Sequence, residues 1–290
     1  MRSSAVLGAV ARSGALAAIV LVLVVAIGAG LGVDGVAILY FSVWIGALLA
    51  AAVGAFLIAR ARRPIAGAGA LIAAVAAWLP FFWRSSPSGI VWTIAFILGV
   101  GLIAWGTRQD TDVPLALPLL IARFTVGWAF LDNAVNDQVW VPSGGGFLST
   151  ANAAAGRAPL DFIDPTYHAF LSGSVIPHAG TWAGLFLGGE FAFGLLVAIG
   201  LFTPVAAWGA MWLSANIVLE KSFITHGTYV DKTYFLLETV CLITGAGRAY
   251  GLDAVLRHSL PPVAMAPLTG AAIGAPSALE GRGPARVASA

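Results

Sequence analysis

The sequence predicts an all-α integral membrane protein with about eight transmembrane helices, and two observations carry this prediction. Among 290 residues, 59% are hydrophobic and only 10% are charged, with a mean hydropathy of +0.92, whereas soluble domains carry about 25% charged residues. The apolar residues also form continuous runs of about 20, the length that a helix needs to cross roughly 30 Å of hydrocarbon. Because these runs do not alternate with period two, helices are expected rather than barrel strands.

Four candidate spans lie before residue 110 and four lie after it. The first has an alternative interpretation as a cleaved signal peptide, because Arg2 and Arg12 precede it, although its apolar run is longer than a typical signal core. The seventh is short and the eighth begins with polar residues, so the ends of these two are the least well defined. The runs are residues 13–33, 37–59, 65–83, 89–106, 113–131, 181–202, 205–219 and 229–245.

A polar segment, residues 107–112, interrupts the apolar sequence and divides the chain into two membrane units. Residues 1–110 form a predicted N-terminal four-helix unit without ionisable side chains at depth, in which Gly and Ala residues allow close helix approach. Residues 111–260 form a predicted second four-helix unit with a long loop at 132–180. The segment 261–290 is rich in Ala, Pro and Gly and has too little bulk for a core, so it is predicted to be disordered.

The basic residues predict the orientation of the chain in the membrane. With the N-terminus in the cytoplasm, ten arginines fall on the cytoplasmic side and Arg123 lies within a span, out of 15 basic residues. The residues that fall outside are Arg84, Arg157, Lys221 and Lys232. This asymmetry follows the positive-inside rule. We therefore expect a multi-pass protein of the cell (inner or plasma) membrane with both termini in the cytoplasm and loop 132–180 outside.

Several classes of function are disfavoured by composition. The chain has one cysteine, Cys241, inside an apolar run, so a disulfide framework, a Cys-x-x-Cys redox pair, a c-type haem and a thiolate-bound iron–sulfur cluster are not expected. None of the four His residues lies deep in a span, and no pair shares a helix at ligand spacing, so no metal or transmembrane haem is expected. A net charge of +2 without a basic run among aromatics argues against a nucleic-acid partner.

Three ionisable residues lie inside predicted spans: Arg123 in the fifth, Glu190 in the sixth and Glu238 in the eighth. Each lies about nine or ten residues into its span, which at about 1.5 Å per residue predicts a depth near the membrane midplane. Because a charge at this depth costs several kcal/mol, such residues usually pair or serve a function. We therefore expect Arg123 to form an ion pair with one of the glutamates, and we assign all three as candidate catalytic residues. The alternative is a structural salt bridge that sets helix register.

A second group of polar residues lies near the predicted outer surface. Lys221, His226 and Lys232 flank one short loop, where they offer positive charge and hydrogen-bond donors to a small oxyanion. With His178 and Trp140 they are the candidate substrate-binding residues. The alternative is that lysines at span ends reach toward the interface and that Trp140 belongs to an aromatic belt.

Short motifs recur in order along the second half of the chain. They are residues 122–128 (ARFTVGW), 144–148 (GGGFL), 188–196 (GGEFAFGLL), 200–204 (GLFTP) and 245–253 (GAGRAYGLD). Together these resemble the DoxX/DoxD family of small membrane proteins over residues 114–260. The elongated outer loop is more similar to DoxD, the membrane subunit of thiosulfate:quinone oxidoreductase, than to the shorter DoxX proteins.

The resemblance implies a C-terminal four-helix DoxX/DoxD-like bundle in a membrane oxidoreductase subunit. Such a subunit passes electrons from a small, thiosulfate-like sulfur anion to membrane quinone, which is a substrate, without metal or haem. Arg123 would then orient a quinone carbonyl, while Glu190 and Glu238 would handle protons. Besides lipid and quinone, a separate DoxA-like subunit is an expected partner. The alternative function is a non-catalytic membrane scaffold that recruits redox or envelope proteins.

Overall fold

The computed structural model describes the chain in five segments, and every regular element in them is a helix. The predicted all-α class is therefore confirmed for this part of the chain. Most of the first predicted span, His226 and the tail 261–290 lie outside the described residues. The described segments are residues 10–19, 33–82, 88–142, 144–225 and 229–259.

The protein is a multi-pass membrane protein. Four helical stretches are long and apolar enough to cross a membrane, namely Gly35–Ala59, Pro64–Phe81, Gly89–Thr107 and Asp164–Ile199. The prediction of eight spans is not confirmed, because the remaining long helices of the described part are more polar or shorter. The helices are α2 (Gly35–Ala59), α3 (Pro64–Trp78), α4 (Ser88–Thr107), α5 (Ala116–Asp137), α6 (Gly145–Ala155), α7 (Asp164–Phe170), α8 (Ala179–Ile199), α9 (Thr203–Glu220), α10 (Tyr229–Thr244) and α11 (Asp253–Ser259).

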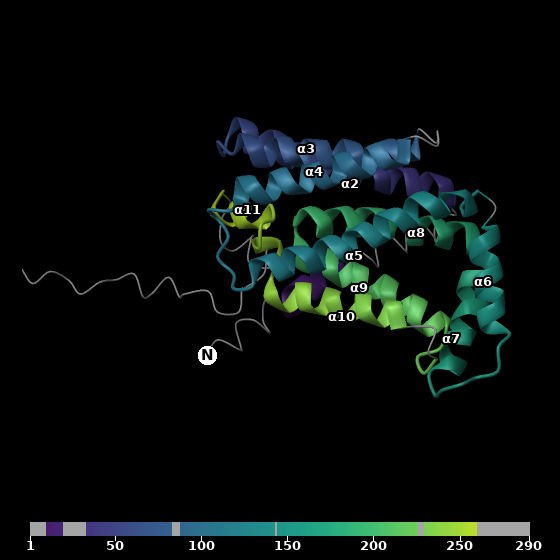
Figure 1. The fold of residues 1–290 in the computed structure, drawn as a ribbon. Coiled ribbons are helices and arrows are strands. Elements are labelled where there is room, and N and C mark those ends of the chain that lie inside the picture. The colour runs from purple at the N-terminus through teal and green to yellow at the C-terminus, as the bar shows by residue number, and fades with distance from the viewer. Residues whose placement is uncertain (1–9, 20–32, 83–87, 143, 226–228, 260–290) are drawn as a thin grey trace, which may run out of the picture.

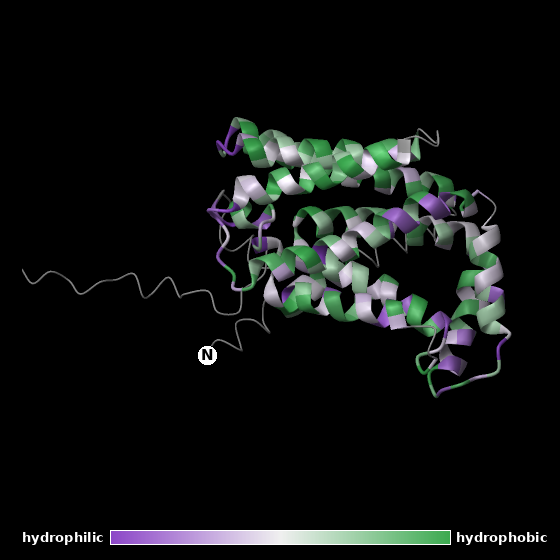
Figure 2. Ribbon diagram, in the orientation of Figure 1, coloured by the Kyte–Doolittle hydropathy of each residue, from purple (hydrophilic) through white to green (hydrophobic). Residues whose placement is uncertain are grey.

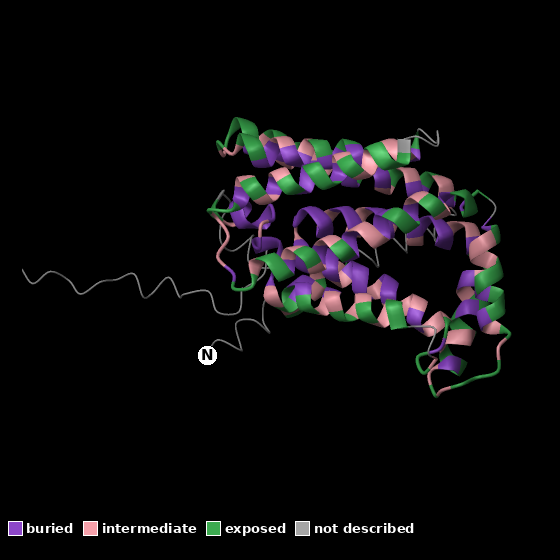
Figure 3. Cartoon of the chain, in the orientation of Figure 1, coloured by how far each residue is buried: buried purple, intermediate pink, exposed green. Residues whose placement is uncertain are grey.

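Helix α8 lies at the centre of the bundle and contacts helices of both membrane units. It packs against α2 on one side and against α5 and α9 on the other, while α3 and α4 extend the layer that begins with α2 (Figure 1). Its residues are therefore mostly buried, whereas α3 and α4 keep exposed apolar faces (Figure 3). Those exposed faces suit lipid, because hydrocarbon imposes no cost on apolar side chains.

Small residues set the close helix contacts, as predicted from the sequence. A side chain at Gly54 on α2 would place its Cβ atom 2.8 Å from the carbonyl oxygen of Gly67 on α3. A Cβ atom at Gly127 on α5 would lie 2.6 Å from the carbonyl oxygen of Gly194 on α8. Both helix pairs approach so closely that any larger residue would force them apart.

The segment predicted as a long loop, residues 132–180, contains two helices. It folds as α6 and α7 across one end of the bundle (Figure 1). The Arg157 guanidinium donates to the carbonyl oxygen of Glu220 (2.9 Å), and the hydroxyl of Ser222 donates to Asp161 (3.1 Å). These bonds attach the segment to the end of α9, so we name this side of the molecule the α6–α7 end.

At the opposite end, the polar segment 107–112 is held by charged contacts. Arg248 and Arg257 both pair with Asp112, and Arg63 lies 2.7 Å from Asp110. The Arg257 guanidinium also donates to the carbonyl oxygen of Asp110 (3.1 Å), so this hydrogen bond joins the two membrane units in addition to the α2–α8 contact. We name this side the basic end, and its hydrophilic residues stand out against the apolar helices (Figure 2). Its arginines are Arg60, Arg62, Arg63, Arg108, Arg248 and Arg257.

Candidate functional site

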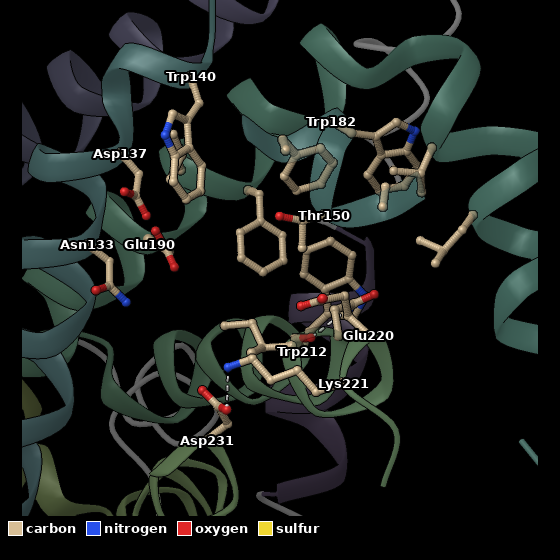
Figure 4. A pocket seen from close by; sticks show the side chains of 18 of the residues that line it. Asn133, Asp137, Trp140, Thr150, Trp182, Glu190, Trp212, Glu220, Lys221 and Asp231 are labelled. Atoms are coloured by element: carbon tan, nitrogen blue, oxygen red, sulfur yellow. Dashed lines mark hydrogen bonds and ion pairs between the residues drawn. The ribbon is translucent and has the colours of Figure 1, made fainter. Parts of the chain in front are cut away.

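A cavity of about 370 Å³ lies at the α6–α7 end, between α5, α6, α7, α8, α9 and the first turn of α10 (Figure 4). Among the described residues, seven aromatic side chains line it, from α6, α7, α8, α9 and the residues around them. The Phe170 and Trp182 rings meet edge to face at 5.5 Å, and Phe186 lies 5.9 Å from Phe147 and 6.3 Å from Trp212. Such pairs fix one another's orientation. The cavity therefore has ordered, largely apolar walls that suit a flat ring.

The charges in the cavity wall are mainly negative. Lys221 is the one basic residue among the described residues that line the cavity. Its Nζ atom lies 2.8 Å from the Asp231 carboxylate. Pairing neutralises most of this lysine's field, because an opposite charge lies beside it. The carboxyl groups of the wall are those of Asp137, Glu190, Glu220 and Asp231.

Glu190 brings a carboxyl group into the cavity from α8. The residue is only 3% exposed, and its Oε2 atom has no hydrogen-bond partner within the described residues. The Asn133 side chain lies beside the same carboxyl group, and Asp137 lies nearby (Figure 4). No arginine or lysine of the described chain lies within ion-pair distance of Glu190. The cavity thus contains a buried, unpaired carboxyl group beside an amide.

Arg123 does not pair with either glutamate, so that prediction is wrong. Its fully buried guanidinium donates to the carbonyl oxygens of Ala246 (3.1 Å) and Tyr250 (3.3 Å), which follow α10. Side chains on a helix lean toward its N-terminus. Because α5 begins at the basic end, Arg123 leans toward that end, whereas Glu190 lies on the antiparallel α8 and leans toward the α6–α7 end. Similar depths of Cα atoms therefore do not bring these charges together.

The residues around Arg123 form a junction of two sequence motifs. Gly200 and Gly251 leave the space that the guanidinium occupies, since a Cβ atom at either position would overlap its Nη1 atom. The Asp253 carboxylate accepts from the backbone N–H groups of Phe202 (2.8 Å) and Thr203 (3.0 Å) at the start of α9. Burial raises the pKa of Asp253 to about 6, although these hydrogen bonds favour its charged form. We call Arg123, Gly200, Gly251 and Asp253 the Arg123 junction.

Local sequence explains why this junction forms where it does. α8 ends at Ile199 and is capped by Gly200, whose φ of 68° is the left-handed conformation that glycine adopts without strain. α9 follows with Pro204 in its first turn, where a missing N–H costs nothing. The backbone N–H of Asp253 then donates to the Gly200 carbonyl oxygen (2.8 Å). The two motifs therefore act as one helix-connecting structure.

Glu238 lies in a third environment, on α10. It is fully buried, and the Ser214 hydroxyl donates to its Oε1 atom at 2.8 Å. It is not among the residues that line the cavity. The three predicted catalytic residues are thus distributed among the cavity, the Arg123 junction and the α9–α10 contact.

The predicted substrate-binding residues are also divided. Trp140 and Lys221 line the cavity, and the Trp140 indole packs flat over Gly146, where a Cβ atom would lie 2.6 Å from its Cδ2 atom. Lys232 donates to the carbonyl oxygen of Thr225 (3.3 Å) outside the cavity lining. His178 is exposed at the start of α8 and also lies outside the lining, and the described residues do not include His226.

From the sequence, Asn133 is a polar residue near the predicted outer surface, but neither Asn133 nor Asp137 was assigned to the site, and the structure places both in the cavity wall. Their spacing of four puts both on the face of α5 that meets Glu190. The spacing of four in the sequence indicates that the two residues share one face of a helix. It does not indicate which other helix packs against that face. Sequence analysis also missed Asp253, which was visible only as the last residue of a motif.

A known protein family matches the part of the chain that forms the cavity and the Arg123 junction. The family model DoxD, described as the TQO small subunit DoxD, matches residues 119–269. The chain belongs to the DoxD family. The DoxD match includes the whole cavity lining and the Arg123 junction but excludes α2, α3 and α4. No solved structure matches this DoxD chain.

Proposed function

We propose that this DoxD protein is the quinone-binding subunit of a thiosulfate:quinone oxidoreductase-like enzyme, with the quinone ring in the aromatic cavity. The observation that carries the proposal is the unpaired Glu190 carboxyl group inside an aromatic wall. Cavities that bind small molecules commonly measure about 300–1,000 Å³ and combine apolar walls with a few polar groups. At about 370 Å³, this cavity suits a single substituted ring.

The polar groups of the cavity match the chemistry of quinone reduction. Conversion of a quinone to a quinol takes up two electrons and two protons, and each carbonyl oxygen accepts a hydrogen bond. The Asn133 amide can donate such a bond, while Glu190 and Asp137 can pass protons from the same wall. We therefore assign proton transfer to Glu190, with Asn133 and Asp137 as supporting groups. Arg123 acts as a positioning residue, since it contacts the helix connections rather than the cavity.

The same wall disfavours the sulfur anion as its ligand. A small oxyanion would meet the carboxyl groups of Asp137, Glu190, Glu220 and Asp231, with Lys221 already paired. Like charges at short range repel strongly where the dielectric constant is low. We therefore propose that the anion is oxidised on a separate DoxA-like chain, which delivers electrons to the quinone held here.

Quinone binding can be tested without the partner chain. Trp140, Trp182 and Trp212 line the cavity, so a bound quinone should quench tryptophan fluorescence in the purified protein. Glu190→Gln keeps size and hydrogen bonding, so it should still bind quinone but should slow quinone reduction at least tenfold, the range that general acid–base groups contribute. Glu238→Gln is the matched control, because Glu238 is equally buried but outside the cavity lining.

Reduction is measured with the partner chain present and with thiosulfate, sulfide or sulfite as donor. An equal loss of activity in the Glu190 and Glu238 variants would remove the assignment of proton transfer to the cavity. If wild type neither binds quinone nor reduces it with any of these donors, the scaffold function becomes the better explanation.

A further inference from the structure

A second cavity, of about 230 Å³, lies at the basic end, where the α2–α3 turn meets the end of α4. It is outside the DoxD match, and the proposed quinone chemistry does not use it. Three arginines contribute to its wall, together with an indole and an amide. Its lining residues are Arg62, Arg63, Pro64, Ile65, Trp105, Gly106, Arg108 and Gln109.

Two of these arginines have no negative partner. Arg63 pairs with Asp110 at 2.7 Å, but neither Arg62 nor Arg108 forms an ion pair within the described residues. The first turn of α3 contains no acidic residue either. The cavity therefore has about two uncompensated positive charges, and both are accessible to an anion because the Arg62 and Arg108 side chains are exposed.

The positions of these arginines are defined rather than loose. The Arg108 guanidinium lies 4.3 Å from the centre of the Trp105 ring, a cation–π contact that restricts its movement. Arg62 has a φ of 53°, a left-handed backbone conformation that strains a residue other than glycine. Strained backbone conformations are concentrated at functional sites, so the conformation of Arg62, an exposed residue that lines the cavity, supports a binding role for this turn.

The surroundings indicate a lipid rather than a free ion. Trp105 is 59% exposed and Ile65 is 44% exposed, so apolar side chains border the arginines. α3 and α4 are both long and apolar enough to span the membrane, and the cavity lies where α3 begins and α4 ends. That position corresponds to the headgroup region of a bilayer, where tryptophan is enriched and basic cavities between helices bind phospholipid headgroups.

We propose that this cavity binds the phosphate of an anionic phospholipid, with Arg62 and Arg108 on the phosphate and Trp105 against the lipid backbone. The cavity gives the N-terminal helices a lipid-binding role that is independent of quinone chemistry. It also fits the predicted orientation, in which the basic end faces the cytoplasm.

Native mass spectrometry of the purified full-length protein tests this assignment. Phosphatidylglycerol and phosphatidylcholine with the same acyl chains are added separately, and inorganic phosphate is added in a third arm. Wild type should bind phosphatidylglycerol in preference to phosphatidylcholine. Arg62→Gln with Arg108→Gln should weaken phosphatidylglycerol binding about 25-fold, because each basic side chain near an anionic headgroup contributes about fivefold.

Two further variants separate this cavity from general surface charge. Arg60→Gln removes an arginine of the same turn that does not line the cavity, so it should leave phosphatidylglycerol binding nearly unchanged. Arg62→Lys with Arg108→Lys keeps both charges and should retain most of the binding even if the glutamine variants fold poorly. Equal binding of the two lipids, or an equal loss with Arg60→Gln, would overturn the proposal. Displacement of the lipid by millimolar phosphate would reassign the cavity to a free anion.

Discussion

Replacement of Arg123 by alanine tests the geometry of the charged groups most directly. The guanidinium is fully buried and donates to the carbonyl oxygens of Ala246 and Tyr250. Hydrogen bonds from a charged donor contribute about 1.5–3 kcal/mol each. Loss of both, with a cavity left between Gly200 and Gly251, should lower the free energy of unfolding by about 3–5 kcal/mol. Glu190→Ala removes a carboxyl group without a cationic partner, so it should cost about 1 kcal/mol or less.

A double-mutant cycle separates this structure from the alternative of an Arg123–Glu190 ion pair. Residues without shared partners give additive effects within about 0.5 kcal/mol, whereas residues in one network couple by about 0.5–3 kcal/mol. Arg123→Ala should therefore be additive with Glu190→Ala but coupled to Asp253→Asn, because Arg123 and Asp253 interact electrostatically within the same junction. Reversible unfolding in bicelles by added detergent provides the free energies. A coupling above about 1 kcal/mol between Arg123 and Glu190 would show that the two side chains do not lean toward opposite ends of the bundle.

Three further outcomes are expected. Because burial raises the pKa of Asp253 from 3.8 to about 6, Asp253 binds more protons in the folded protein than in the unfolded chain between these values, so it should make Tm fall as pH rises from about 4 to about 6; the fall over this pH range should be smaller in Asp253→Asn than in wild type. Gly146→Val should displace the Trp140 side chain and raise the KM for quinone several-fold. Gly173→Val is the control and should leave this KM unchanged, because a Cβ atom at Gly173 meets nothing within 4 Å. Equal KM values in the two variants would argue against the cavity as the quinone site. Lys221→Ala should leave the KM for the sulfur anion unchanged, because that lysine is paired with Asp231; a marked rise in this KM would return the anion to the cavity.

Much of the helical structure was predictable because its causes are local. The predicted run 37–59 became α2 at Gly35–Ala59, and the run 229–245 became α10 at Tyr229–Thr244. A continuous apolar run satisfies its backbone hydrogen bonds most simply as a helix, and glycine or proline marks where it ends. The family was recognisable for a related reason, since the order of short motifs survives in the linear sequence.

The short helices α6 and α7 were not predicted, and the cavity could not be predicted without them. Their segment is less apolar than the spans, so hydropathy reports only a loop. Its packing depends on partners such as Glu220 and Ser222, which lie about 60 residues away in sequence. No periodic pattern in residues 132–180 indicates those contacts.

The sequence alone determined that this is an α-helical membrane protein of the DoxD family with three ionisable residues inside its apolar runs. Only the tertiary structure decided what those residues contact. Arg123 and Glu190 lie on antiparallel helices, so their side chains lean toward opposite ends of the bundle even though each lies about midway along its run. Arg123 consequently binds the backbone that follows α10, and Glu190 faces the aromatic cavity. Depth along a helix is a property of the sequence, whereas the direction of a side chain relative to its neighbours follows from how the helices pack.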